Sequence, residues 1–205
     1  MWFLRMRIRA AFAVALLTTT QLSCSEKVVA PSQPPTDQLP FEWSFEQDGQ
    51  PTLEGWRIGN PSLTTLVREP APGGGEWSLG LAADWAPTTG FIFRPMLGVR
   101  NGDILQLSAF VRAFGQSGGG FIVLSVGPDS RQGRGKWAGS ASTSWTQLSL
   151  QDTVSLAPGD TVWVTLSSPN TEVAARQGRF DLVELRRIGS VTPTQRQHRV
   201  RVAFP

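Results

Sequence analysis

The segment "DILQLSAFVRAF", residues 103–114, alternates apolar side chains with a second set of residues along its whole length. Side chains alternate between the two faces of a β-strand, so this pattern predicts a strand with one face in a core. The apolar set is Leu105, Leu107, Ala109 and Val111. The opposite set is Gln106, Ser108, Phe110, Arg112 and Phe114. The face predicted to meet solvent therefore carries two phenylalanines and an arginine among its polar residues.

Further short apolar or alternating segments recur between residues 41 and 190, separated by runs rich in Gly, Pro, Asn and Asp. They are 41–46, 63–69, 77–84, 89–96, 120–127, 145–156, 160–168 and 179–188. Many short strands joined by turn residues predict an all-β sandwich, and roughly 150 residues suit one domain. No unit of roughly 33 to 45 residues repeats, which argues against a propeller or solenoid.

The N-terminal residues combine arginines with an apolar run that is too short to span a bilayer permanently, a pattern typical of a signal peptide. Cys24, the only cysteine, follows this run directly. The order resembles a bacterial lipoprotein signal, which implies cleavage after residue 23, lipidation of Cys24 and an exported protein anchored in the cell envelope. Ser25, where an Asp would resemble an inner-membrane retention signal, favours the outer membrane. The alternatives are an ordinary secretory signal followed by an incidental cysteine, or a buried structural thiol.

Four segments are therefore expected: a signal peptide at 1–23, a disordered Pro-rich tether at 24–40, the sandwich at 41–190 and a basic tail at 191–205. The tail holds the only histidine, His198, and either frays or adds a strand to a sheet edge. Six of the 19 Lys and Arg residues lie in the two ends, whereas all 16 acidic residues lie between them. The remaining 13 basic residues give residues 24–190 a net charge of −3, which excludes general binding of nucleic acid.

Five motifs in order carry a resemblance to a known family. They are "WSFEQDGQPTLEGW", "GGGEWSLGLAAD", "NGDILQLSAFVRA", "STSWTQLSLQDTVSL" and "GRFDLVELRRI". Together they resemble carbohydrate-binding modules of families 4, 9 and 22, which are jelly-roll sandwiches of the galactose-binding-like group. The resemblance implies a single non-catalytic jelly-roll module that binds an oligo- or polysaccharide.

The resemblance also implies that 103–114, 120–127 and 161–168 share one sheet, with 103–114 in the centre. Alternation then gathers outward side chains on one face, where aromatic rings stack on sugars and polar groups select hydroxyls. Phe110, Phe121 and Trp163 are the expected platforms, and Arg112 and Gln106 the expected hydrogen-bonding groups. Trp85 and Trp137, in predicted loops, are secondary contact candidates.

Two other interpretations of the same face stay open. It could dock another protein of the cell envelope, or the segment 127–144 could cover it. The tryptophans in predicted strands and turns, Trp43, Trp56 and Trp145, are expected to pack rather than bind.

A structural calcium ion is implied by the resemblance alone, with Glu46 and Asp181 as ligands that backbone carbonyls or Glu76 would complete. The alternative is that these carboxylates are solvated or pair with Arg57 or Arg179. Catalysis is not expected, because the sandwich holds no histidine and its acids lie mostly in turns, where Asp bonds the local backbone.

Overall fold

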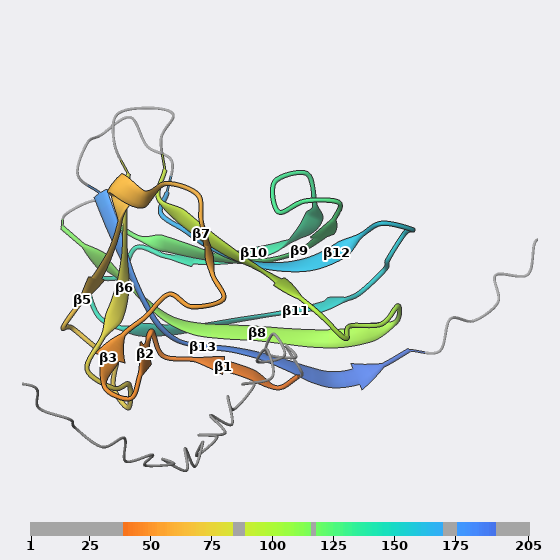
Figure 1. Ribbon diagram of the computed structural model, residues 1–205, viewed down its shortest axis with the longest axis horizontal. Helices are drawn as coiled ribbons and strands as arrows, with labels where there is room; N and C mark the ends of the chain where they lie inside the picture. The colour runs from red at the N-terminus through yellow and green to blue at the C-terminus, as the bar shows by residue number, and fades with distance from the viewer. Residues whose placement is uncertain (1–38, 84–88, 116–117, 170–175, 192–205) are drawn as a thin grey trace, which may run out of the picture. The chain divides into compact units, whose positions relative to one another are not determined.

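A computed structural model describes residues 39–83, 89–115, 118–169 and 176–191, and these form a sandwich of two antiparallel sheets (Figure 1). Within the described residues, the first sheet has the order β11 (Thr146–Thr153), β8 (Asp103–Phe114), β13 (Arg176–Ser190), β6 (Ser78–Ala83) and β5 (Thr64–Val67), with β1 (Phe41–Trp43) paired to β13. The second sheet has the order β10 (Arg134–Ser140), β9 (Gly120–Gly127), β12 (Thr161–Ser167), β7 (Phe91–Met96) and β4 (Arg57–Ile58).

Outside the two sheets, β2 (Glu46–Gln47) and β3 (Gln50–Pro51) form a small hairpin, and η1 (Pro61–Leu63) is a single 3-10 turn. None of the helical structure in the described part of the chain could cross a membrane. Each segment predicted as a strand contains a strand, so the predicted all-β sandwich is confirmed.

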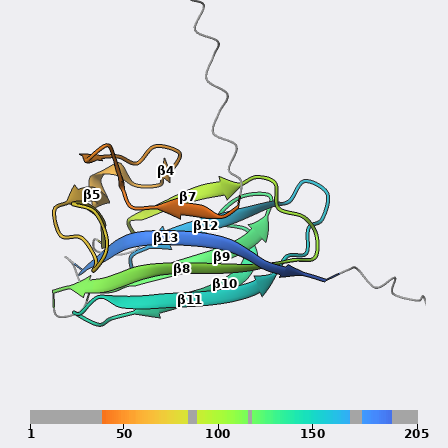
Figure 2. The same cartoon turned by 90° about the horizontal axis from the view of Figure 1, so that it is seen from below.

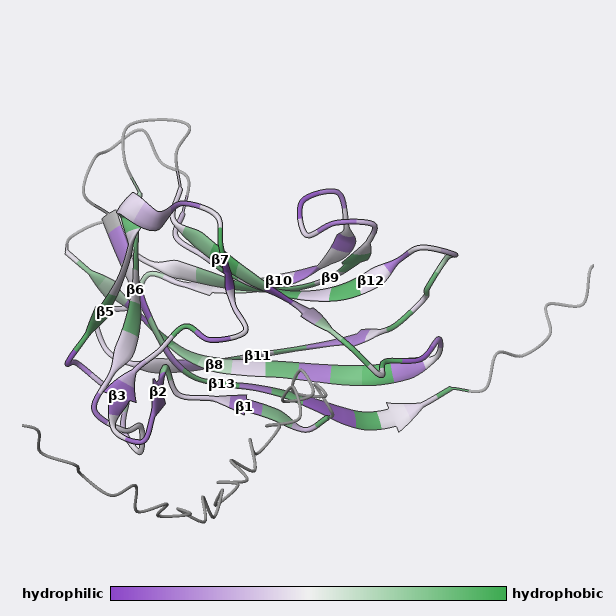
Figure 3. Cartoon of the chain, viewed as in Figure 1, coloured by the Kyte–Doolittle hydropathy of each residue, from purple (hydrophilic) through white to green (hydrophobic). Residues whose placement is uncertain are grey.

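The core follows the predicted alternation, because buried and less buried residues alternate along β8. Figure 3 shows hydrophobic residues in the strands of both sheets. The inward residues of the three segments highlighted above are all buried: Leu105, Leu107, Ala109, Val111, Ile122, Leu124, Val126, Val162, Val164 and Leu166. Burial of each large aliphatic side chain contributes roughly 1.5–3 kcal/mol to folding. Trp56 packs in the same core as predicted, beside Phe41 and Phe45.

The predicted grouping of the strands into one sheet is wrong. The segment 103–114 (β8) lies in the first sheet, whereas 120–127 (β9) and 161–168 (β12 and Ser168) belong to the second (Figure 2). The chain crosses between the sheets through Gly118 and Gly119, and a Cβ at position 118 would overlap the backbone carbonyl of Gln177. Alternation identifies the side of a strand that faces a core, but both sheets face the same core, so it does not identify the sheet.

Candidate functional site

The outer surface of the second sheet gathers aromatic side chains from four neighbouring strands. Cross-strand register sets Val123 between Trp137 and Thr165, and sets Thr165 beside Phe93. One row along, Phe121 lies between Gly139 and Ser167, and Ser167 lies beside Phe91. We name this surface the aromatic face; its members are Phe91, Phe93, Phe121, Val123, Trp137, Trp163, Thr165 and Ser167.

Trp137 and Phe121 form the exposed end of the aromatic face. The Trp137 side chain is 68% exposed, and its ring meets that of Phe121 edge to face, with centroids 5.3 Å apart. Gly139 makes room for this pair, because a Cβ there would overlap the Phe121 ring. Both rings line a cavity of about 310 Å³ that the glycines 118–120 and Pro169 complete. A large apolar ring is thus held in fixed orientation beside open space.

At the other end, a second cavity of about 350 Å³ opens beside Phe91. Its lining is rich in hydroxyl groups: Thr89, Ser130, Thr165 and Ser167. Arg131, from the turn between β9 and β10, also lines it and lies 5.1 Å over the Phe91 ring. Figure 1 shows this turn rising from the outer side of the sheet. Asp129 stabilises the turn, because its Oδ1 accepts hydrogen bonds from the backbone N–H groups of Arg131 (2.7 Å) and Gln132 (2.8 Å).

Trp163 lies on the aromatic face but does not offer an open ring, unlike the platform predicted. It is only 6% exposed, its Nε1–H donates to the Gly127 carbonyl at 3.1 Å, and the Phe93 ring lies 5.9 Å from its own. The Arg57 guanidinium lies 5.9 Å over the indole. Trp163 therefore supports the face from within, and Phe93 and Arg57 cover it.

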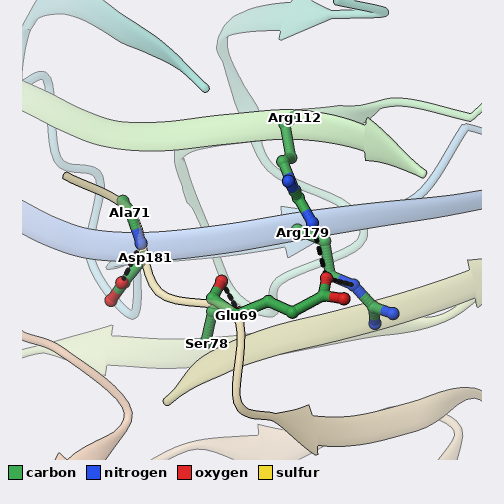
Figure 4. Close-up of polar contacts among 6 residues, drawn as sticks. All are labelled: Glu69, Ala71, Ser78, Arg112, Arg179 and Asp181. Atoms are coloured by element: carbon green, nitrogen blue, oxygen red, sulfur yellow. Dashed lines mark hydrogen bonds and ion pairs between the residues drawn. The ribbon is translucent and has the colours of Figure 1, made fainter. Parts of the chain in front are cut away.

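Phe110, Arg112 and Gln106 project from β8 on the far side of the sandwich, so the predicted single platform does not form. Gln106 donates to Ser149 Oγ at 2.9 Å, and Phe110 lines a separate cavity of about 550 Å³ with Trp43. Arg112 bonds the carboxylate of Glu69, as Figure 4 shows, and lies 5.2 Å over the Trp145 ring. These three side chains cannot share a ligand with Phe121 or Trp163.

The two loop tryptophans have different outcomes. Trp85 lies outside the described residues. Trp137 lies in strand β10 instead of the predicted loop, and the segment 134–140 forms an edge of the second sheet. Sequence reasoning also missed Phe91 and Phe93, although their alternation with the buried Ile92 was the signal that marks them as outward residues.

Glu46 and Asp181 converge on the segment 71–77, next to Gly74 and Gly75. Asp181 is fully buried and accepts hydrogen bonds from the N–H groups of Ala71 (Figure 4) and Leu182, both at 2.8 Å. Glu46 Oε2 accepts the N–H groups of Glu76 (2.6 Å) and Trp77 (3.2 Å).

Burial raises the pKa of Asp181 to about 6, and the negative charge of Glu46 adds to this rise, while the two N–H donors oppose it. In the described part of the chain, neither carboxylate pairs with Arg57 or Arg179, and Arg179 instead lies 3.6 Å from Glu69. No group of three or more acidic, His or Cys side chains is arranged for a metal among these residues. The two carboxylates fit a hard cation such as calcium only if backbone oxygens complete its shell.

No family model and no curated protein sequence matches this chain. Among solved structures, the fold is similar to the CBM22-1 xylan-binding domain of Paenibacillus barcinonensis Xyn10C, with a TM-score of 0.52, 16% identity, and coverage of 74% of this chain and 95% of that one. The fold is also similar to the CBM22-2 xylan-binding domain of the same protein, with a TM-score of 0.53, 15% identity, and coverage of 72% of this chain and 98% of that one. For the C-terminal family 22 carbohydrate-binding module of Clostridium thermocellum Xyn10B, the TM-score is 0.53 and the identity 14%, with coverage of 78% of this chain and 99% of that one.

At these identities the likeness establishes the fold alone, because one architecture hosts many functions. The described domain is a jelly-roll β-sandwich whose fold is similar to that of these modules. The fold implied by the five sequence motifs is therefore confirmed, and the function has to be argued from the aromatic face.

Proposed function

We propose that this domain is a non-catalytic carbohydrate-binding module that takes an oligo- or polysaccharide on the aromatic face. The observation that carries the proposal is the Trp137–Phe121 pair, in which a 68% exposed indole is held by a ring packed edge to face at 5.3 Å. Water contact with so large an apolar surface is unfavourable, and a sugar ring removes it by stacking its C–H groups on the indole.

The polar groups of the aromatic face support the same ligand class. Thr165 and Ser167 line the cavity beside Phe91, so a chain lying across the strands would meet a stacking surface first and hydroxyl groups next. A few placed polar groups among aromatic side chains are typical of small-ligand sites. Two of the similar solved structures are xylan-binding domains, which makes xylan a first ligand to try.

An alternative proposal has a cell-envelope protein docking on the same face, since an exposed apolar patch also marks protein interfaces. The hydroxyl-lined cavity beside Phe91 favours the sugar, because a flat protein interface does not require it. Nucleic acid is not a proposed partner, given the net charge of residues 24–190.

A glycan array that includes xylan tests the proposal, with Trp137→Ala and Phe121→Ala as variants and Phe110→Ala as the matched control from the opposite sheet. We expect loss of at least tenfold in affinity for Trp137→Ala, which is about 1.4 kcal/mol or more for an aromatic contact, and no loss for Phe110→Ala. A blank array together with a specific protein crosslinked at position 137 would favour the alternative.

We also propose that one structural calcium ion is held by Glu46 and Asp181 with backbone oxygens of segment 71–77. Its chemistry there would be neutralisation of two close carboxylates, one of them fully buried. A bound ion stabilises the folded state by mass action, so the thermal midpoint should rise by several degrees in millimolar calcium. Equal thermal midpoints with calcium and with chelator would show that the folded protein binds no calcium ion at this site.

The anchoring of the protein remains a proposal, because Cys24 lies outside the described residues. We propose that the chain is exported and attached to the envelope, on the outer membrane, through lipid on this cysteine. Mass spectrometry of the mature N-terminus and a Cys24→Ser variant test it. Wild-type protein should carry the acyl mass, and an unmodified cysteine in the membrane fraction would contradict the proposal.

A further inference from the structure

We propose that the glycan bound by the aromatic face is acidic, carrying carboxylate groups that Arg57 and Arg131 recognise. This inference rests on the proposed function and adds the chemical class of the ligand. The charged side chains of the aromatic face support it.

Arg57 and Arg131 are exposed residues, and both are stacked on rings of the aromatic face. Arg131 lies 5.1 Å over Phe91, and Arg57 lies 5.9 Å over Trp163. A cation–π contact attracts each guanidinium to its ring but leaves its N–H donors free to bond a ligand. Two cations thus lie on a surface that also carries the proposed stacking ring.

Neither arginine has an ion-pair partner in the part of the chain that the structure describes. On the far sheet, by contrast, Arg112, Arg186 and Arg187 each pair with a carboxylate. Asp129 is the acidic residue of the turn that carries Arg131, and its Oδ1 already accepts two backbone N–H groups of that turn. Among the described residues, the aromatic face therefore carries two cations that no carboxylate pairs with.

The cavity beside Phe91 adds a second observation. The Thr165 hydroxyl that lines it is buried without a hydrogen-bond partner. A buried hydroxyl without a partner costs free energy, and an acceptor oxygen of a ligand in this cavity would satisfy it. An oxygen-rich anionic sugar supplies acceptors for both the guanidinium and this hydroxyl. A planar carboxylate also matches the guanidinium fork better than a neutral hydroxyl does.

The test uses the intact exported protein and two probe polymers, glucuronoxylan and polygalacturonate, each beside its carboxyl-reduced neutral form. We expect at least one acidic polymer to bind about tenfold or more tightly than its reduced form, because charge-assisted hydrogen bonds are about twice as strong as neutral ones. That preference should shrink between about 0.05 and 0.5 M NaCl.

Variants assign the preference to the two arginines. Arg131→Ala and Arg57→Ala should each weaken binding of the acidic polymer more than binding of its reduced form, and so reduce the acidic preference. Arg131→Lys should retain part of it, and the exposed Arg100→Ala, in the turn before β8, is the matched control that should change nothing. Trp137→Ala should weaken binding of both polymer forms equally.

Three results would overturn the inference, and they separate it from the proposed function. Equal affinity for acidic and reduced polymers would show that the ligand need not be acidic, and would leave the proposed glycan binding standing. A preference for the acidic polymer that persists in both alanine variants would show that Arg57 and Arg131 do not recognise the carboxylate. Absence of binding to all four polymers and to the glycan array overturns the inference and the proposed function together.

Discussion

The buried carboxylate of Asp181 predicts that folding stability increases as the pH falls, which is the opposite of the usual effect of an acidic residue. Its pKa in the folded protein rises from 3.8 to about 6, so the folded state binds a proton more tightly than the unfolded state does. Stability then rises as the pH falls through 6 and levels off below about 4. For the calcium-free protein, the linkage relation gives a gain of about 1 kcal/mol between pH 7 and pH 5, after an allowance for solvent screening.

Urea denaturation of protein passed over a chelating resin measures this difference. With a slope of about 2 kcal/mol per molar for a domain of this size, the midpoint should rise by about half a molar from pH 7 to pH 5. Asp181→Asn is the matched control, because the amide does not titrate and its midpoint should change less over the same range. Added calcium should also flatten the profile, since a bound cation keeps the carboxylate ionised. A wild-type midpoint that falls from pH 7 to pH 5 in calcium-free buffer would refute the reasoning.

Other predictions concern the aromatic face and its support. Gly139→Ala should weaken glycan binding about tenfold, because the added Cβ overlaps the Phe121 ring and moves the Trp137 indole that packs on it. Isothermal titration calorimetry measures this affinity. Unchanged affinity would exclude a role for the Trp137–Phe121 pair in binding. Trp163→Phe should lower stability by about 1–3 kcal/mol, because it removes buried volume and leaves the Gly127 carbonyl without its donor. A thermal midpoint equal to wild type would show that the indole is not part of the packing.

The sequence predicts the core of this protein well and its site poorly, for a physical reason. Alternation in 103–114 follows from burial of one strand face, and that burial holds for Leu105 and Leu107 whichever sheet β8 joins. The grouping of Phe110 with Phe121 depends on sheet membership, which long-range pairing decides and local periodicity does not record.

The edge strand β10 was predicted as a loop because its sequence, "RGKWAGS", is rich in glycine and has no apolar alternation. It pairs along its length with β9, and its residues are exposed or half-buried, with Ala138 the residue that packs against the core, so burial shaped little of its composition. Trp137 thus belongs to a strand that orients it across from Val123. The tryptophan was a correct candidate for exposure, although the reason given for it, a loop, was wrong.

Mapping the ligand on the folded chain tests the central claim most directly. In a two-dimensional amide and indole NMR titration with xylo-oligosaccharides and acidic oligosaccharides, we expect shifts to gather at the Trp137 indole N–H and along β9, β10 and the turn that carries Arg131. Residues around Phe110 and Gln147 on the other sheet should stay unchanged. Shifts confined to that other sheet would contradict the account.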